Sequence, residues 1–185
     1  MGRVIQFEDH ALARLRERCA AAEEANQDLL AFARGHSGAV SSIHSAVLAA
    51  LEAQSFDDLL HVVTQEWPLI LGIDAVALAL VVSGRGFRVD SGGVQLVDAL
   101  VLQRLLDQVD GVVLHRVERG HPLFGPACEL IRAEALIRLE GDAPAGLLVL
   151  GQRVGQPLDG RNGSELLLFL GRSLSAMITR WTLTS

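Results

Sequence analysis

Residues 123–151 constrain the fold more than any other part of the chain, because they predict a short helix followed by two antiparallel strands. Residues 135–140 alternate between apolar and more polar side chains, which is the period of a strand with one wetter face. Residues 141–144, Gly-Asp-Ala-Pro, are typical of a turn. Residues 146–151 are almost entirely apolar, which predicts a strand buried on both faces. Such a hairpin closes a small α/β sandwich and contains no evident reaction centre.

The composition excludes several classes of function. With 185 residues and 50% hydrophobic content, the chain can form one domain with a real core and an extension. Its net charge of −6 gives no overall electrostatic attraction for nucleic acid. All 16 basic residues are arginine, and tyrosine is absent. A P-loop lysine, a Schiff-base lysine and a tyrosine general acid are therefore excluded.

The cysteines and the apolar stretches indicate the compartment. Cys19 and Cys128 lie far apart in the sequence, which favours free thiols in a reducing environment over a disulfide scaffold. The first ten residues carry charges and lack the apolar run of a signal peptide. The longest apolar stretch, at residues 75–82, is too short to span a bilayer. We therefore expect a cytoplasmic protein without a membrane anchor.

The first 53 residues differ in character from the rest, so we predict an N-terminal helical segment at 1–53 and a second domain at 54–185. Residues 7–33 contain no proline or glycine, and their apolar positions follow a heptad. We expect this helix to pair with a second copy in a homodimer; the alternative is that it packs on its own domain. The sequence Gly-His-Ser-Gly at 35–38 predicts a break in the helix. The residues predicted to form the dimer seam are Leu12, Leu15, Cys19, Asn26 and Leu29.

Downstream of this segment, helical and strand patterns mix without strict βαβ alternation. A helix should begin with Ser55 as its N-cap, bend at Pro68 and end at Gly72. The patterns then predict a hairpin at 75–89, a helix at 96–109, a strand at 112–117, the 123–151 segment and a helix at 164–181. We therefore predict an α+β fold, with a mainly antiparallel sheet between helices.

Several segments resemble a known bacterial family. They are SSIHSAVLAALEA at 41–53, GIDAVALAL at 72–80, LFG at 123–125, EALIRL at 134–139 and AGLLVLG at 145–151, together with the acidic-aromatic start around Phe7. This pattern resembles the domain of unknown function 484, and more broadly a GAF domain preceded by a signalling-type helix. The chain departs from the family pattern at 151–155, Gly-Gln-Arg-Val-Gly.

The resemblance implies a GAF-like sandwich, helical dimerisation and no established reaction. Members of the family tend to be encoded near a tyrosine recombinase, so the resemblance also implies a protein partner in chromosome processing. GAF domains that bind cyclic nucleotides carry a lysine-containing motif, which this chain cannot supply. The sequence does not identify a cofactor.

Three functions remain open from the residues themselves. We predict a non-enzymatic sensor or ligand-binding regulator; the alternatives are an enzyme that uses Cys128 with His115 or His121 as base, and a structural adaptor without a ligand. The histidines and cysteines lack the spacing of common zinc sites, so no metal is expected.

A pocket should open between the strand at 112–117 and the helix near 124–131, with the loop at 118–122 as a lid. The residues predicted to bind a small, flat, anionic ligand are His115, Arg132, Arg116, Arg138 and Cys128, while Arg88 and Glu140 also lie on or beside strands.

Overall fold

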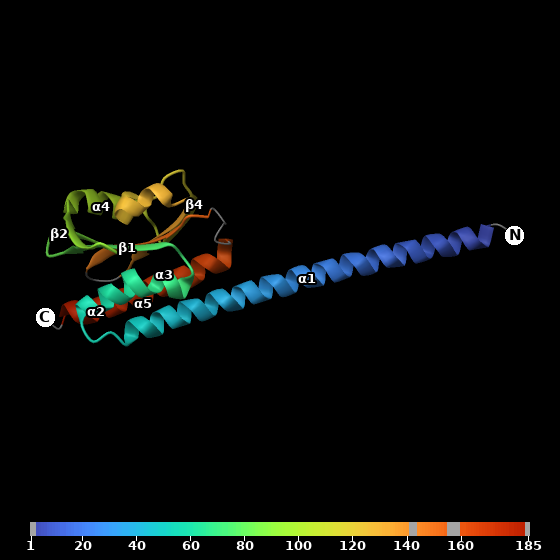
Figure 1. The fold of residues 1–185 in the computed structure, drawn as a ribbon, viewed down its shortest axis with the longest axis horizontal. Helices are drawn as coiled ribbons and strands as arrows, with labels where there is room; N and C mark the ends of the chain where they lie inside the picture. The colour runs from blue at the N-terminus through green and yellow to red at the C-terminus, as the bar shows by residue number, and fades with distance from the viewer. Residues whose placement is uncertain (1–2, 141–143, 155–159, 184–185) are drawn as a thin grey trace. The chain divides into compact units, whose positions relative to one another are not determined.

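The computed structural model describes residues 3–140, 144–154 and 160–183, although the side chains of some residues in the first and last helices are not described (Figure 1). The chain divides into two compact units, Met1–Ala39 and Val40–Ser185. The first helix, α1 (Arg3–Leu51), supplies the described structure of the first unit and contributes its last turns to the second.

Helix α1 differs from the prediction at its glycines. The expected break at 35–38 is wrong, because α1 is continuous through Gly35 and Gly38. Glycine weakens a helix interior by about 1 kcal/mol relative to alanine, a cost that helical neighbours can absorb, and no proline is present to block the backbone. The side chains predicted to form the dimer seam lie outside the described part of the chain; they are Leu12, Leu15, Cys19, Asn26 and Leu29.

The second unit is built around one antiparallel sheet of six strands in the order β3-β2-β1-β6-β5-β4. This confirms the predicted α+β class with a mainly antiparallel sheet. The strands are β1 (Ala75–Val82), β2 (Arg85–Asp90), β3 (Gly93–Val97), β4 (Val112–Arg116), β5 (Ala133–Leu139) and β6 (Ala145–Gln152). The central strands β1 and β6 pair along almost their full length, from Ala75 opposite Gly151 to Val81 opposite Ala145.

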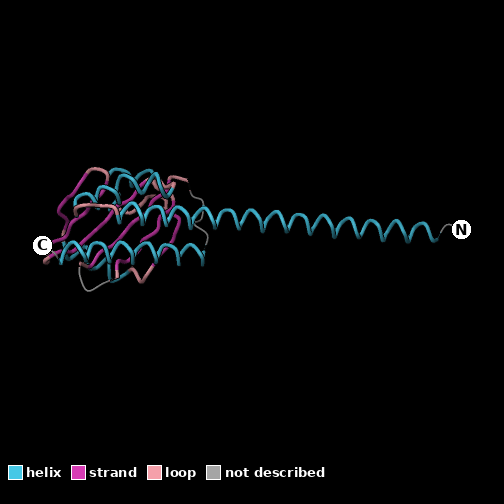
Figure 2. Tube along the Cα trace, turned by 90° about the horizontal axis from the view of Figure 1, so that it is seen from below, coloured by secondary structure: helices cyan, strands magenta, loops and turns pink. Residues whose placement is uncertain are grey.

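Helices cover both faces of the sheet. They are α2 (Phe56–His61), the π-helical turn η1 (Val62–Glu66), α3 (Trp67–Leu71), α4 (Ala99–Gln108), the 3₁₀ segment η2 (Pro122–Leu130) and α5 (Gly160–Leu183). Within this unit, α2, α3 and α5 lie on one side of the strands and α4 on the other (Figure 1). Seen from below, the strands lie side by side and run obliquely to the helices (Figure 2).

Alternation along the strands creates two apolar cores, one on each face. In β1, Val76, Leu78 and Leu80 join the core that includes α5 and the end of α1, whereas Ala77 and Ala79 face α4 and η2. The predicted strand at 146–151 is confirmed as buried throughout. We refer to the face that carries Ala77 and Ala79 as the α4 face.

The helix that precedes β1 follows its predicted signals. The amide of Asp58 donates to Ser55 Oγ at 3.1 Å, which confirms the N-cap. Gly72 ends the helical region with φ +66°, ψ +37°, the left-handed conformation that glycine adopts without steric cost.

The prediction of a helix at 96–109 is wrong at its start. Gly93–Val97 forms β3 and pairs with β2 along its whole length. The helix begins only after Asp98, whose Oδ1 accepts a hydrogen bond of 2.8 Å from the amide of Leu100. Leu96 in β3 and Leu100 in α4 are four residues apart, the spacing of apolar residues on one face of a helix, and this caused the error.

The wetter face predicted for β5 is present only toward the end of the strand, because Leu136 packs in the core of the α4 face, whereas Glu140 is exposed. Leu136 is only 5% exposed, and Arg138 is partly buried. Residues 141–143 of the predicted turn at 141–144 lie outside the described part of the chain. The last helix starts earlier than predicted, at Gly160 and not at Ser164.

Candidate functional site

The α4 face is closed by η2, whose apolar side chains reach β6. Phe124 and Ile131 are 3% and 1% exposed. A Cβ atom at Gly151 would lie 2.7 Å from Phe124 Cζ and 2.8 Å from Ile131 Cδ1. Glycine at this position therefore allows η2 to close on the sheet, and only a movement of η2 would expose this part of the face.

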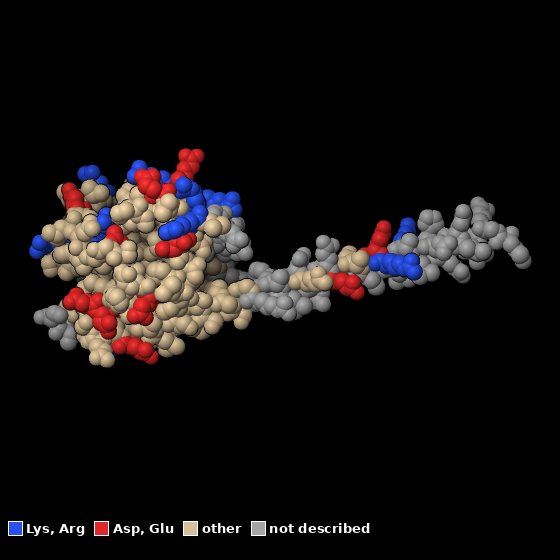
Figure 3. Space-filling view, viewed as in Figure 1, with Lys and Arg blue, Asp and Glu red and all other residues tan. Residues whose placement is uncertain are grey.

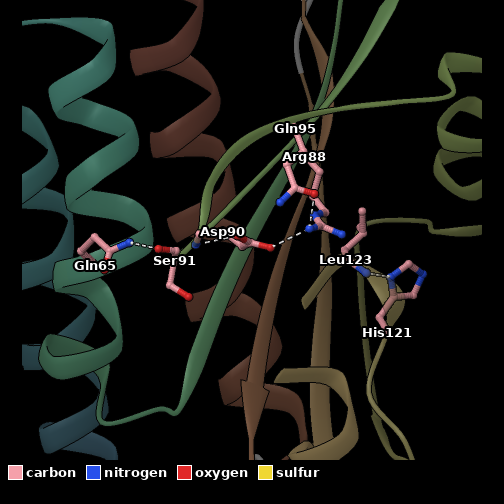
Figure 4. A network of polar contacts seen from close by, with 8 residues as sticks. Gln65, Arg88, Asp90, Ser91, Gln95, His121 and Leu123 are labelled. Carbon is pink, nitrogen blue, oxygen red and sulfur yellow. Dashed lines mark hydrogen bonds and ion pairs between the residues drawn. The ribbon is translucent and has the colours of Figure 1, made fainter. Parts of the chain in front are cut away.

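An ion pair on β2 interrupts this apolar surface. Arg88 Nη2 lies 3.1 Å from Asp90 Oδ2, and the two side chains are 16% and 8% exposed. Residues two apart in a strand share a face, and Val89 between them belongs to the opposite core. Arg88 Nη2 also donates to Gln95 Oε1 at 2.6 Å, and Asp90 Oδ1 accepts from the amide of Gly92 at 2.7 Å (Figure 4). The pair is thus held in place from β3 and from the β2–β3 turn.

Two polar atoms of this pair remain unsatisfied. Arg88 Nε and Asp90 Oδ2 are buried and have no hydrogen-bond partner among the described residues. The 3.1 Å contact of Oδ2 with the guanidinium is an ion pair without hydrogen-bond geometry. Buried polar groups normally find partners, because an unmet donor or acceptor costs about 1–3 kcal/mol. A donor and an acceptor are therefore available together on an apolar face.

Gly125 covers the pair. It interrupts the 3₁₀ segment with φ +58°, ψ −133°, a conformation that only glycine adopts readily. A Cβ atom here would lie 2.9 Å from Asp90 Oδ2 and 3.2 Å from Arg88 Nη2. Both the backbone conformation and the close approach therefore require glycine.

A second polar cluster holds the start of η2. The carboxylate of Glu134, on β5, is 4% exposed. Its Oε1 lies 2.9 Å from His115 Nε2, and its Oε2 accepts a hydrogen bond of 2.7 Å from the amide of His121. His121 Nδ1 in turn accepts from the amide of Leu123 at 3.1 Å and caps η2 (Figure 4).

The surroundings of His121 favour its neutral form. Burial lowers the pKa of the imidazole below its usual value, and the proximity of His115 lowers it further, while the negative charge of Glu134 opposes the shift. A neutral ring is also what the cap requires, because a protonated Nδ1 cannot accept a hydrogen bond.

The predicted ligand-binding residues do not converge on one point. Arg132 is exposed and its Nη1 donates to the carbonyl oxygens of Glu129 and Ile131 at 2.8 and 2.9 Å. Arg138 Nη1 donates to Leu106 O at 2.7 Å and so caps the end of α4. Arg116 is exposed at the end of β4. Of the predicted set, His115 alone takes part in a buried polar cluster.

Cys128 lies in the core of the α4 face and is 6% exposed. Its polar neighbour is Arg119, whose pKa is raised by a hydrogen bond with the Cys128 side chain and next by the charge of Glu129. Arg119 Nη2 also forms an ion pair of 2.6 Å with Glu129 Oε1. The two histidines proposed as bases contact other groups, as described above.

The segment predicted to be a lid is bonded to its surroundings in this conformation. The amide of Val117 donates to Arg132 O at 2.9 Å, and that of Gly120 donates to Cys128 O at 2.8 Å. A Cβ atom at Gly120 would lie 2.5 Å from Ile131 Cβ. The loop at 118–122 therefore packs against η2 and the residues that follow it.

Sequence reasoning missed Asp90 and Gly125. Asp90 was placed in a loop, because residues 90–93, Asp-Ser-Gly-Gly, are typical of turns. The alternation Phe87-Arg88-Val89-Asp90 was the signal that could have extended the strand to Asp90.

Among the residues that the structure describes, no three His, Cys, Asp or Glu side chains gather as metal ligands. No helix within the described ranges combines the length and the apolar character needed to cross a bilayer. On the face of the Val40–Ser185 unit seen in Figure 3, charges of both signs are interspersed with uncharged surface.

Comparison with protein families identifies the chain. Residues 1–183 match the family described as "Protein of unknown function, DUF484". The chain belongs to this family. No curated protein matches this DUF484 chain.

Solved structures show the fold. The GAF domain of a phosphoenolpyruvate-protein phosphotransferase from Coxiella burnetii is 14% identical with a TM-score of 0.58, over 80% of this chain and 97% of that one. The GAF domain of a two-component sensor histidine kinase from Bacillus halodurans is 14% identical with a TM-score of 0.55, over 71% and 99%. The chromophore-binding domain of a Stigmatella aurantiaca bacteriophytochrome is 17% identical with a TM-score of 0.53, over 75% and 59%. The predicted GAF-like fold and DUF484 membership are both confirmed.

Proposed function

We propose that this DUF484 chain is a non-enzymatic regulatory module of the GAF type. It binds a small molecule on the α4 face and dimerises through its N-terminal helix. The observation that carries the ligand-binding part is the Arg88–Asp90 pair, which brings an unsatisfied donor and an unsatisfied acceptor together on a buried apolar face.

The chemistry of the pair indicates what a ligand would look like. Arg88 Nε has no acceptor, and the contact of Asp90 Oδ2 is the ion pair with the guanidinium, so the complementary molecule carries an acceptor and a donor close together, as an amide edge does. The flanking residues Ala77 and Ala79 are small and apolar, which suits a flat molecule. Because Gly125 covers the pair, binding requires η2 to move away from the sheet.

The solved relatives give a context for a sensing role. Their names describe a sensor histidine kinase and a chromophore-binding domain of a bacteriophytochrome. A module that binds a small molecule and passes the signal through a helix would fit this group, and α1 enters the core of the domain through Ile43, Ala46 and Ala50.

The contacts of the histidines disfavour the thiol enzyme. A base for Cys128 has to hold a free ring nitrogen within hydrogen-bond reach of the sulfur. One nitrogen of each ring is already engaged, because His121 Nδ1 accepts from Leu123 and His115 Nε2 faces Glu134. Cys128 itself is only 6% exposed in the core of the α4 face. We therefore favour Cys128 as a packing residue of the core.

Native mass spectrometry of the purified protein tests the proposal, because it reports both the oligomeric state and any ligand retained. A thermal-shift screen of small amides, carboxylates and nucleobases should then find compounds that stabilise the protein. Replacement Arg88→Met should remove that stabilisation, whereas Arg116→Met on the exposed end of β4 should keep it. A monomer without ligand, and no compound that distinguishes the two variants, would contradict the proposal.

A further inference from the structure

The start of η2 is tied to the sheet through one histidine. The amide of His121 donates to Glu134 Oε2 at 2.7 Å, which fixes the loop to β5. The Nδ1 of His121 accepts from the amide of Leu123 at 3.1 Å (Figure 4). The carbonyl oxygen of His121 accepts from the amide of Phe124 at 3.0 Å. One residue therefore joins the sheet to the first turn of the segment that carries Phe124 and Gly125.

These bonds depend on the charge of the ring. Neutral imidazole can accept at Nδ1, whereas imidazolium donates from both nitrogens and would place an N–H against the N–H of Leu123. Protonation therefore replaces a hydrogen bond with a repulsive contact at the N-cap. The next residues, Leu123 and Phe124, are 7% and 3% exposed, so the start of η2 cannot shift without uncovering apolar surface.

We propose that His121 is an acid-sensitive clasp, which holds η2 over the Arg88–Asp90 pair when neutral and releases it when protonated. Release would uncover the pair that Gly125 covers and would loosen the core around Cys128. The part of this inference that concerns ligand access rests on the proposed function, whereas the opening of η2 does not.

The charges around His121 set the direction of the response. Glu134 on β5 attracts a proton to the ring, while burial and His115 on β4 oppose it, and the net effect is a pKa below the ordinary value. On η2 itself, Glu129 is already paired with Arg119. The open form, in which His121 meets water, recovers the usual pKa of about 6.5, so opening becomes more favourable as the pH falls below that value.

The test uses the buried thiol of Cys128 as a reporter in the full-length protein without ligand. In a Cys19→Ser background, a dithiopyridine reagent labels Cys128 only when η2 opens. The labelling rate of the protein with His121 is divided by the labelling rate of a His121→Asn variant at the same pH. Asparagine keeps an N-cap acceptor but does not titrate. The ratio therefore removes the intrinsic pH dependence of the thiol.

We expect a ratio near one at about pH 8 and a rise of about fivefold or more by about pH 5. A ratio that stays constant over this range would overturn the clasp. Hydrogen exchange gives the second measurement: the amides of Leu123 and Phe124 should lose protection in acid while those of Leu170 and Leu174 in α5 keep it. Simultaneous loss at all four positions would indicate global unfolding and would also overturn the proposal. Because no ligand is added, these results are separate from failure of the proposed function.

Discussion

The indole Nε1 of Trp67 donates a hydrogen bond of 2.9 Å to the carbonyl oxygen of Ala46. Both residues are fully buried, and the bond joins the start of α3 to the last turns of α1. Ile43 and Ala50 lie in the same core. The end of α1 is therefore an integral part of the GAF-like unit, so a change in α1 can reach the sheet through packed side chains.

Replacing Trp67 should test this connection. We expect Trp67→Phe to lower the free energy of unfolding by about 1–3 kcal/mol, because it removes a buried hydrogen bond and leaves part of the indole volume empty. Chemical denaturation measures the change. Leu69→Ala, at a position that is 85% exposed on the same helix, is the control and should change stability by less than about 0.5 kcal/mol. Equal effects of the two replacements would contradict the role of Trp67.

The cover over the Arg88–Asp90 pair can be tested at Gly125. We expect Gly125→Ala to destabilise the protein by about 2 kcal/mol or more, since it adds backbone strain and a contact with Asp90 Oδ2. Gly84→Ala is the matched control, because Gly84 also has positive φ, +75°, but nothing lies within 4 Å of its Cβ position. That variant should cost about 1 kcal/mol from strain alone. A smaller loss for Gly125→Ala than for Gly84→Ala in thermal unfolding would show that the close approach is unimportant.

Arg138 offers a test of whether a predicted ligand-binding arginine has a structural role instead. Arg138→Met keeps the apolar stem but removes the donor to Leu106 O, so we expect a loss of about 1.5–3 kcal/mol in stability without any ligand present. Arg116→Met, at the exposed end of β4, should change stability by less than about 0.5 kcal/mol. If the Arg138 variant unfolds at the same denaturant concentration as the wild type, the cap does not contribute.

Local sequence signals predicted most of the fold. The apolar run in β1, the hairpin that β1 forms with β2, the Ser55 cap and the apolar run in β6 each depend on neighbouring residues, and each was confirmed. The errors arose where two local signals competed. The apolar residues of β3 matched the helical spacing of α4, and the pairing of β3 with β2 together with the hydrogen bond to Asp98 shows that the helix begins later.

The candidate site was harder to predict, because it depends on contacts between distant segments. Arg88 was noted as a polar residue on a strand, but its role follows from Gly125, which reaches it from η2. Arg132 and Arg138 looked suited to an anion, yet their donors are bonded to backbone carbonyl oxygens. The family resemblance supplied the fold and could not supply these pairings.

The dimer prediction depends on residues whose side chains are not described, so it needs a direct experiment. We expect the full-length chain to sediment as a dimer, because an alanine-rich helix as long as α1 gains most of its stability from packing. Removal of residues 1–39 should shift the protein toward monomer. This cut leaves Ile43, Ala46 and Ala50, which are 5%, 0% and 3% exposed, in the core of the GAF-like unit. Removal of residues 1–53 is the contrasting variant, and it should lose stability because it deletes those side chains and the partner of Trp67. A full-length chain that remains monomeric at high micromolar concentration would refute dimerisation through α1, whereas a dimer that survives removal of residues 1–39 would place the contact within the GAF-like unit.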